Sequence, residues 1–262
     1  MTVRGKADLH MHTRHSDGAP TVQALLDHVA GKTCLGVIAI TDHDTIAGAL
    51  EARALMARRP YPFEVIVGEE VSTRDGHLVG LFLDERIPAG MTARDTVTAI
   101  HGQGGLAFAP HPFFHARQEP GSAVTMVGLG ETVRELALDA VETLNATPFL
   151  AAANRRARAF NVETTRLPEL GASDGHILAA IGKGYTEFPG ATASDLATAI
   201  RAGTVAAMGD RYAPRELLAY LDFWVRQQRR PGAMMRSVRP LFERGGRARR
   251  KRGASAPDTA SI

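Results

Sequence analysis

Hydrophobic residues in this chain fall into short, dense runs that alternate with longer segments of helical spacing. The dense runs predict seven strands, over residues 7–12, 36–41, 63–70, 77–83, 105–110, 139–145 and 168–173. Apolar residues three and four positions apart predict helices over 21–31, 44–58, 93–103 and 148–160. Because strands and helices alternate, the pattern favours parallel β/α units, arranged as a barrel or as a doubly wound sheet.

The C-terminal part of the chain differs from the rest in charge. Residues 211–262 contain 13 Lys and Arg but only 4 Asp and Glu, whereas residues 1–210 contain 18 and 24. This shift predicts a domain of residues 1–210 followed by a helical, basic extension of residues 211–262. Apolar spacing over 216–225, around the single Trp224, predicts a helix that docks on the domain. We expect the end of the extension to be disordered, with weak nonspecific affinity of the basic residues 244–253 for nucleic acid.

Composition narrows the class of protein. A chain of 262 residues, 44% of them hydrophobic, is long enough to bury the core of one large α/β domain. The one cysteine, Cys34, excludes a disulfide within the chain and suits a reducing compartment. The start has no apolar signal core and no run could span a bilayer, so we expect a soluble, cytoplasmic protein. The sequence contains no phosphate-binding P-loop motif, which argues against nucleotide-triphosphate motor chemistry.

Metal-binding side chains recur where the predicted strands end. Seven of them close or follow five of the strands: His10, His12, His43, Glu69, His111, Asp174 and His176. The carboxyl ends of strands in a β/α barrel or an open α/β sheet gather at one face, so we expect these side chains to meet in space. Asp17 follows the first strand closely. His77 begins a strand instead, which fits an antiparallel hairpin after Glu69.

The number and type of these groups predict a centre with several metal ions. The nine residues offer six imidazoles and three carboxylates. One zinc ion takes about four ligands, so nine ligands imply two or three ions. Mixed nitrogen and oxygen donors favour Zn, Mn or Fe over Ca or Mg, and the absence of a thiolate argues against a structural zinc site.

Alternation along the strands predicts what the neighbouring residues do. Asp8, His10 and His12 share one face, and Asp8, deeper in the core, is expected to accept a hydrogen bond that fixes a histidine tautomer. Glu70 directly follows Glu69 and is therefore expected to face away from the metals.

Six segments between residues 6 and 176 resemble, in order, the motifs of the PHP (polymerase and histidinol phosphatase) domain family. They are DLHMHT with SDG, AITDHD, GEEVS, GHLVGLF, APHPF and ASDGH, the last differing from the more frequent SDAH without loss of a ligand. The resemblance implies a distorted seven-stranded β/α barrel with the metal centre at the strand ends. It also implies three ion sites: His10, His12, Glu69 and Asp174; His77 and His111, with Glu69 as the bridge; and Asp17, His43 and His176.

The activity that this resemblance implies is hydrolysis of phosphate esters, of the phosphomonoester, nucleotide or bisphosphate type. Clustered divalent ions lower the pKa of a bridging water and supply hydroxide at neutral pH, so no protein nucleophile is required. We expect Glu69, Asp174 and His176 to act in catalysis on a small phosphorylated substrate. Asn145 and Arg117 are candidates for binding the substrate, Arg117 through its planar guanidinium, although the sequence fits an ordinary surface arginine equally well.

Three other functions fit parts of the same pattern. An exonuclease acting on short oligonucleotides would use a similar cluster of ions. An amidohydrolase-like barrel also opens with His-x-His, but it typically adds a carboxylated lysine, and no lysine of residues 1–210 ends a predicted strand. A nucleic-acid-binding protein with a structural metal centre would depend on the basic extension, so removal of that extension would distinguish it.

Overall fold

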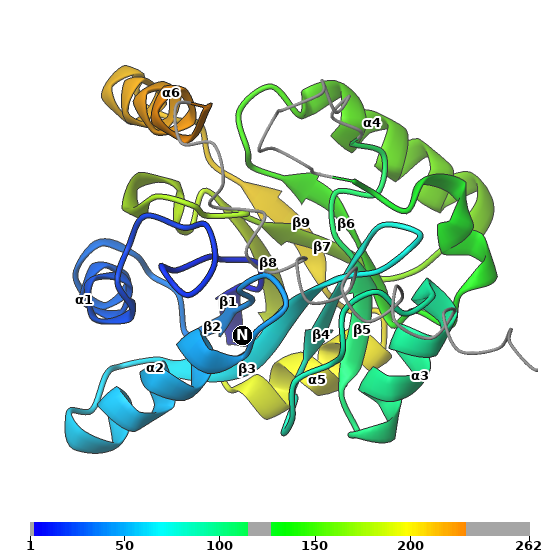
Figure 1. The fold of residues 1–262 in the computed structure, drawn as a ribbon, viewed down its shortest axis with the longest axis horizontal. Coiled ribbons are helices and arrows are strands. Elements are labelled where there is room, and N and C mark those ends of the chain that lie inside the picture. The colour runs from blue at the N-terminus through cyan, green and yellow to red at the C-terminus, as the bar shows by residue number, and fades with distance from the viewer. Residues whose placement is uncertain (1–2, 115–126, 229–262) are drawn as a thin grey trace, which may run out of the picture.

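The computed structural model describes residues 3–114 and 127–228, within which nine strands form one sheet surrounded by helices (Figure 1). The strands are β1 (Arg4–Asp8), β2 (Val37–Ile40), β3 (Glu64–Ser72), β4 (His77–Leu81), β5 (Leu106–Ala109), β6 (Ala140–Asn145), β7 (Glu169–Ala172), β8 (Gly184–Pro189) and β9 (Ala206–Gly209). The α-helices are α1 (Val22–Lys32), α2 (Ala47–Arg58), α3 (Ala93–Gly102), α4 (Ala151–Phe160), α5 (Ala193–Arg201) and α6 (Pro214–Gln228). Three short helical turns complete the described elements: η1 (Gly130–Glu135), η2 (Asn161–Thr165) and η3 (Leu178–Ala180).

The order of strands in the sheet runs from β7 back to β1 and then continues with β8 and β9. Strands β1, β2 and β3 are parallel, and so are β5, β6 and β7. Strand β4 is antiparallel to both β3 and β5, so the predicted hairpin is present. Strands β8 and β9 extend the sheet beyond β1 in antiparallel pairings.

The sheet curls until β7 lies against β8 and β9, which makes a nearly closed, distorted α/β barrel. Glycines permit this close approach. A Cβ on Gly171 of β7 would lie 2.8 Å from the Met208 nitrogen in β9, and one on Gly184 would collide with the Ala172 carbonyl. The Thr186 hydroxyl bridges the seam, because it donates to the Gly171 carbonyl at 2.9 Å and accepts from the Gly171 N–H at 3.1 Å. The predicted fold class is confirmed.

Two apolar clusters stabilise the barrel. Ile38 and Ile40 of β2 belong to the cluster that includes residues of α1, α2 and α3. Val37 and Ala39, which alternate with them, belong to a second cluster together with Leu196 of α5. All five side chains are fully buried. Strand β2 is therefore covered on both faces, which explains its continuous apolar run.

The seven predicted strands are present as β1–β7, and the four predicted helices as α1–α4. Two further strands make the sheet nine-stranded within the described residues. Strand β8 (GYTEFP) mixes polar and apolar residues between Gly and Pro, and β9 (AAMG) is only four residues long, so neither stands out as a dense apolar run. No helix in the described ranges is long and apolar enough to cross a membrane.

The helix predicted near the C-terminus is α6, and it packs on the barrel. Tyr220 is 2% exposed and lies in an apolar cluster with Ile177. Lys183 Nζ lies 2.8 Å from Glu216 Oε2, which adds an ion pair between the body and the helix. The end of the extension that is predicted to be disordered, with the basic residues 244–253, lies outside the described residues, which stop at residue 228.

Candidate metal centre

Six segments bring imidazole and carboxylate groups to one end of the barrel. Eight of the nine predicted ligands meet there: His10, His12, Asp17, His43, His77, His111, Asp174 and His176. The topology explains the meeting, because the parallel strands β1, β2, β3, β5 and β7 end at the same face. Strand β4 is antiparallel, so its first residue lies at that face as well.

Glu70 is the carboxylate at the centre of this group, and it is 1% exposed. Five histidine nitrogens lie within 3.3 Å of its two oxygens: His10 Nε2, His12 Nε2 and His43 Nδ1 around Oε2, and His77 Nδ1 and His111 Nε2 around Oε1. One carboxylate thus presents each oxygen to a different set of histidines, as a ligand shared between two ions would.

The prediction that Glu69 faces the histidines while Glu70 faces away is wrong. Glu69 lies on the opposite side of β3, where its Oε2 accepts a hydrogen bond from the Ile87 N–H at 2.7 Å and its Oε1 lies 3.7 Å from Arg86 Nε. Burial there raises the pKa of Glu69 to about 7. Adjacent residues of a strand point to opposite faces, so only one of the two glutamates can reach the centre. Because Glu69 does not reach the histidines, the bridging and catalytic roles predicted for it are wrong as well.

Asp174 approaches the histidines from the end of β7. Its Oδ1 lies 3.3 Å from His12 Nε2, 3.4 Å from His176 Nδ1 and 3.6 Å from His10 Nε2. Asp174 and His111 have positive φ values of 50° and 29°, a conformation that residues other than glycine rarely adopt. Backbone of this kind is concentrated at functional sites, where the surrounding structure holds it in place.

Asp17 forms a further group with His12, His43 and His176. Its Oδ2 lies 3.2 Å from His176 Nε2 and 3.8 Å from His43 Nε2, and its Oδ1 lies 3.7 Å from His12 Nδ1. The rings of His43 and His176 stack against His12, with centroids 4.8 and 4.2 Å away. His12 therefore directs one nitrogen to this group and the other to Glu70.

The donor atoms are arranged so that they could hold metal ions. Four sets have donor atoms within 4.8 Å of one another: His12, Asp17, His43 and His176; His10, His12 and Glu70; His10, His111 and Asp174; and His43, Glu70 and His77. In the described part of the chain, both ring nitrogens of His12 and the Nδ1 atoms of His77 and His111 are buried and make no hydrogen bond of good geometry, although Glu70 Oε1 lies 2.8 Å from His77 Nδ1. Leaving a buried nitrogen unpaired is costly, and coordination of a metal ion removes that cost.

Glu142, a buried residue of β6 that no motif marks, orients His10. Its Oε1 lies 3.3 Å from His10 Nδ1, and its Oε2 accepts hydrogen bonds from the His111 N–H and from Asn145 Nδ2. A carboxylate on the ring nitrogen that points away from a metal fixes the tautomer and the ring orientation. The one sequence feature that could have pointed to Glu142 is that it is the only charged residue in an otherwise largely apolar strand.

Asp8, which was predicted to contact a histidine ring, has backbone partners instead. Its Oδ1 accepts from the Ser173 N–H at 3.0 Å, and its Oδ2 accepts from the Gly182 N–H at 2.9 Å. Burial raises the pKa of Asp8 to about 6. Asp8 therefore ties β1 to the loop that carries Asp174, and the role expected of it at a histidine ring is taken by Glu142.

Asn145, a predicted substrate-binding residue, lies among the carboxylates of the centre and is 1% exposed. Its Nδ2 donates to Glu142 Oε2 at 3.0 Å and to Asp174 Oδ2 at 3.1 Å. Since its amide group is engaged within the protein, contact with a substrate stays a prediction. Arg117, the other predicted substrate-binding residue, lies outside the described residues.

Helix α6 borders the centre. The Phe223 ring centroid lies 6.0 Å from that of His176. The Tyr220 hydroxyl is 3.4 Å from Thr147 Oγ1, which in turn donates to Asp174 Oδ2 at 3.3 Å. The centre is therefore in contact with a helix that lies beyond the predicted boundary at residue 210.

Buried charges in the centre shift several pKa values. Burial opposes ionisation of Glu70, but neighbouring histidines, His43 foremost, hold its pKa well below its usual range. Burial lowers the pKa of His12 to about 4. Burial also disfavours the charged form of His176, yet the adjacent Asp17 raises its pKa to about 10. At neutral pH, before a metal binds, His12 is therefore neutral and His176 carries a proton.

Metal binding that uses His176 is expected to release a proton, so metal affinity should increase with pH. The proton competes with the metal for a ring nitrogen at every pH below the His176 pKa of about 10. Isothermal titration calorimetry in buffers of different ionisation enthalpy measures the number of protons released. A binding heat that does not depend on the buffer, together with a pH-independent affinity, would contradict this expectation.

Several known proteins are similar to this chain in sequence or in fold. Residues 151–205 match a family model described as PHP-associated. The chain is 38% identical over 152 residues to the uncharacterised protein MJ1587 of Methanocaldococcus jannaschii, a match that covers 54% of this chain and 82% of that protein. The chain belongs to the PHP domain family. The PHP motifs quoted from the sequence supply eight of the residues that meet at the barrel end, and the GEEVS motif supplies Glu70.

Two relatives of this PHP chain are named as enzymes that act on phosphate esters. It is 44% identical over 86 residues to the 3′,5′-nucleoside bisphosphate phosphatase of Chromobacterium violaceum, covering 31% of this chain and 29% of that protein. It is 43% identical over 81 residues to the 5′-3′ exoribonuclease Rnm of Escherichia coli, covering 29% and 27%. The match thus spans less than a third of either enzyme.

Solved structures share the PHP fold. A two-domain protein from Bacteroides vulgatus containing a predicted PHP-like metal-dependent phosphoesterase superposes with a TM-score of 0.63 at 18% identity, over 84% of this chain and 70% of that one. PsfC from Pseudomonas syringae superposes with a TM-score of 0.61 at 20% identity, over 85% and 98%. At these identities the likeness establishes the fold alone.

Proposed function

We propose that this protein is a metal-dependent phosphoesterase, which hydrolyses phosphomonoesters of small molecules, of the nucleotide or bisphosphate type, with two or three bound Mn, Fe or Zn ions. The observation that carries the proposal is Glu70, whose two oxygens face separate sets of histidine nitrogens at 2.8–3.3 Å. A carboxylate shared in this way supports neighbouring ions, which is the arrangement used for displacement at phosphorus by water.

The residues of the centre would form separate but adjoining ion sites. Glu70 would be shared, with Asp174 and His10 on one side and His77 and His111 on the other. A further site would be formed by Asp17, His43 and His176, with His12 between the sites. When bound, the ions would activate water and neutralise phosphoryl oxygens.

Residues around these ligands would hold them in place during the reaction. Glu142 keeps the His10 ring oriented so that Nε2 faces Glu70. Asn145 and Thr147 both donate to Asp174 Oδ2, which leaves Oδ1 directed at the histidines. Positioning of this kind supports catalysis because the charged groups do not need to reorganise when the substrate reacts.

The charge of the centre favours a terminal phosphate. Two or three divalent ions carry more positive charge than the carboxylates Asp17, Glu70 and Asp174 neutralise, because the other ligands are neutral imidazoles. The excess attracts a phosphomonoester dianion more strongly than a diester, which carries one negative charge fewer.

Metal-reconstituted protein is therefore expected to cleave p-nitrophenyl phosphate faster than bis(p-nitrophenyl) phosphate, with Mn as the first metal tested. Adenosine 3′,5′-bisphosphate and a short oligonucleotide extend the comparison to the substrates of the two named relatives. In labelled water, the solvent oxygen is expected in the released phosphate. Faster cleavage of the diester and the oligonucleotide would replace the proposal with an exonuclease function. Label in the alcohol would rule out attack at phosphorus, and no hydrolysis with any of the metals would overturn the proposal.

A further inference from the structure

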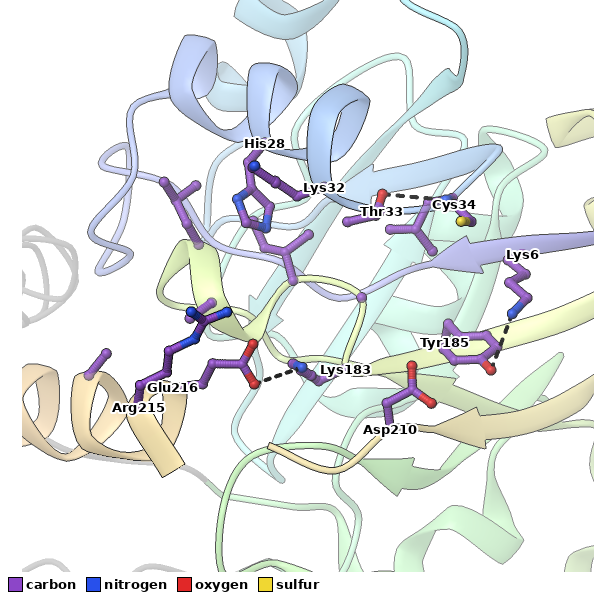
Figure 2. A pocket seen from close by; sticks show the side chains of 16 residues that line it. Lys6, His28, Lys32, Thr33, Cys34, Lys183, Tyr185, Asp210, Arg215 and Glu216 are labelled. Carbon is purple, nitrogen blue, oxygen red and sulfur yellow. Dashed lines mark hydrogen bonds and ion pairs between the residues drawn. The ribbon is translucent and has the colours of Figure 1, made fainter. Parts of the chain in front are cut away.

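A pocket of about 730 Å³ opens beside the barrel, between α1, η3 and α6 (Figure 2). Helix α1 contributes His28 and Lys32 to its lining, Cys34 follows that helix, and α6 contributes Arg215 and Glu216. None of the side chains that meet at the metal centre lines this pocket. It is therefore a separate feature that the proposed hydrolysis does not use.

The lining of the pocket carries an excess of positive charge. Its charged residues are four cations, Lys6, Lys32, Lys183 and Arg215, and two carboxylates, Asp210 and Glu216. Two of the cations have acidic partners, since Lys183 Nζ lies 2.8 Å from Glu216 Oε2 and Lys6 Nζ lies 3.9 Å from Glu187 Oε1. Lys32 and Arg215 form no ion pair with any described residue. The uncompensated charge is thus on the side formed by α1 and α6.

The two uncompensated cations come from different helices, Lys32 from α1 and Arg215 from α6. Figure 2 shows the Arg215 guanidinium extending from α6 toward the His28 imidazole of α1. His28 and Lys32 are four residues apart on α1 and therefore share one side of that helix. Burial lowers the pKa of His28, and Lys32 lowers it further, so the imidazole is neutral at neutral pH. Of the two carboxylates in the lining, Glu216 is paired with Lys183, and Figure 2 shows Asp210 beside Tyr185, away from His28.

The rest of the lining is partly apolar. Five aliphatic side chains contribute to it: Leu35, Leu178, Ala179, Ile181 and Ala219. Leu35 and Ile181 are 8% and 4% exposed and belong to the core, so they fix the position of this wall. Leu178 and Ala179 are partly buried and Ala219 is exposed. An apolar wall beside two unpaired cations suits a ligand that has both an apolar part and a strong negative charge.

We propose that this pocket binds a small organic phosphate, with the phosphate between Lys32 and Arg215 and the organic part against the aliphatic residues. Arginine can hold two phosphate oxygens with its planar fork, and lysine adds a compact positive charge. The volume of about 730 Å³ falls within the range of roughly 300–1,000 Å³ that small-molecule sites occupy. The phosphates of a nucleic-acid backbone offer the same chemistry, and the experiment distinguishes the two sources.

Cys34 gives a local readout, because it is the only cysteine of the chain, is exposed and lines the pocket. In the full-length, metal-loaded protein, phenylphosphonate is expected to slow the alkylation of Cys34 by neutral iodoacetamide. Phenylphosphonate combines a dianion with an aromatic ring and contains no ester that the metal centre could hydrolyse. Benzyl alcohol, which is similar in size but uncharged, is expected to give no protection.

Arg215→Gln and Lys32→Gln are each expected to raise the phenylphosphonate concentration for half-protection about tenfold, while hydrolysis at the metal centre is unchanged. Arg226→Gln is the matched control, because it removes the same charge from α6 at a position outside the pocket lining. No protection in the wild-type protein, or equal protection in all three variants, would overturn the proposal. Protection by a phosphorothioate oligonucleotide but not by phenylphosphonate would also overturn it and assign the pocket to a nucleic-acid backbone.

Discussion

Glu70→Gln is expected to lose bound metal and turnover, whereas Glu69→Gln is expected to keep both. Glu70 lies within 3.3 Å of five histidine nitrogens, so the loss of its charge leaves the ions with one carboxylate fewer. Changes to residues that only support a metal ligand cost about 10–100-fold in affinity or activity, so we expect the ligand itself to cost at least about 100-fold in turnover. Elemental analysis and phosphate release measure the two effects.

The two variants form a matched pair. They make the same chemical change in adjacent, fully buried residues of one strand. Glu69→Gln keeps a carbonyl that can accept the Ile87 N–H, so its effect should be confined to stability. Glu142→Gln is expected to reduce turnover by an intermediate amount, about 10–100-fold, as is typical of residues that support a metal ligand. Normal metal content in Glu70→Gln, or a loss confined to Glu69→Gln, would return the central position to Glu69.

A chain that ends at Asp210 is expected to be less stable and less active than one that ends at Gln228. The shorter chain lacks α6, which buries Tyr220 to 2% exposure and places the Phe223 ring 6.0 Å from that of His176. Exposing the surface that these two aromatic side chains cover should lower the free energy of unfolding by on the order of 3–5 kcal/mol, which corresponds to a fall in Tm of roughly 10 °C. Thermal unfolding and hydrolysis of a small phosphomonoester test both parts.

The chain that ends at Gln228 serves as the control for this truncation. It removes residues 229–262 only, so we expect its Tm and its turnover of a small substrate to equal those of the full chain. Its retention on a polyanion column should fall, most clearly at low salt, because the basic residues 244–253 are gone. Full stability and turnover in the chain that ends at Asp210 would support the boundary near residue 210 that charge predicts, and would show that α6 is dispensable.

Local sequence patterns were sufficient to predict most of the architecture. Strands β1–β7 and helices α1–α4 follow from apolar periodicity, because each element must bury one or both faces against the others. Strands β8 and β9 could not be predicted in this way. Their places are set by pairing beyond β1 and by glycines that allow the barrel to close. The meeting of His10, His43 and Asp174 was also predictable, because the carboxyl ends of parallel strands lie at one face.

Only the tertiary structure decided which carboxylates serve the centre. Residues 66–71 of β3 are all buried, so no polar–apolar alternation distinguishes Glu69 from Glu70. Their orientation is set by pairing with β2 and β4 once the barrel has formed. Glu142 reaches His10 across a sequence separation of 132 residues. The sequence alone therefore predicts which residues lie at the strand ends. The partners that orient them come from distant segments, because these contacts form only when the sheet has curled.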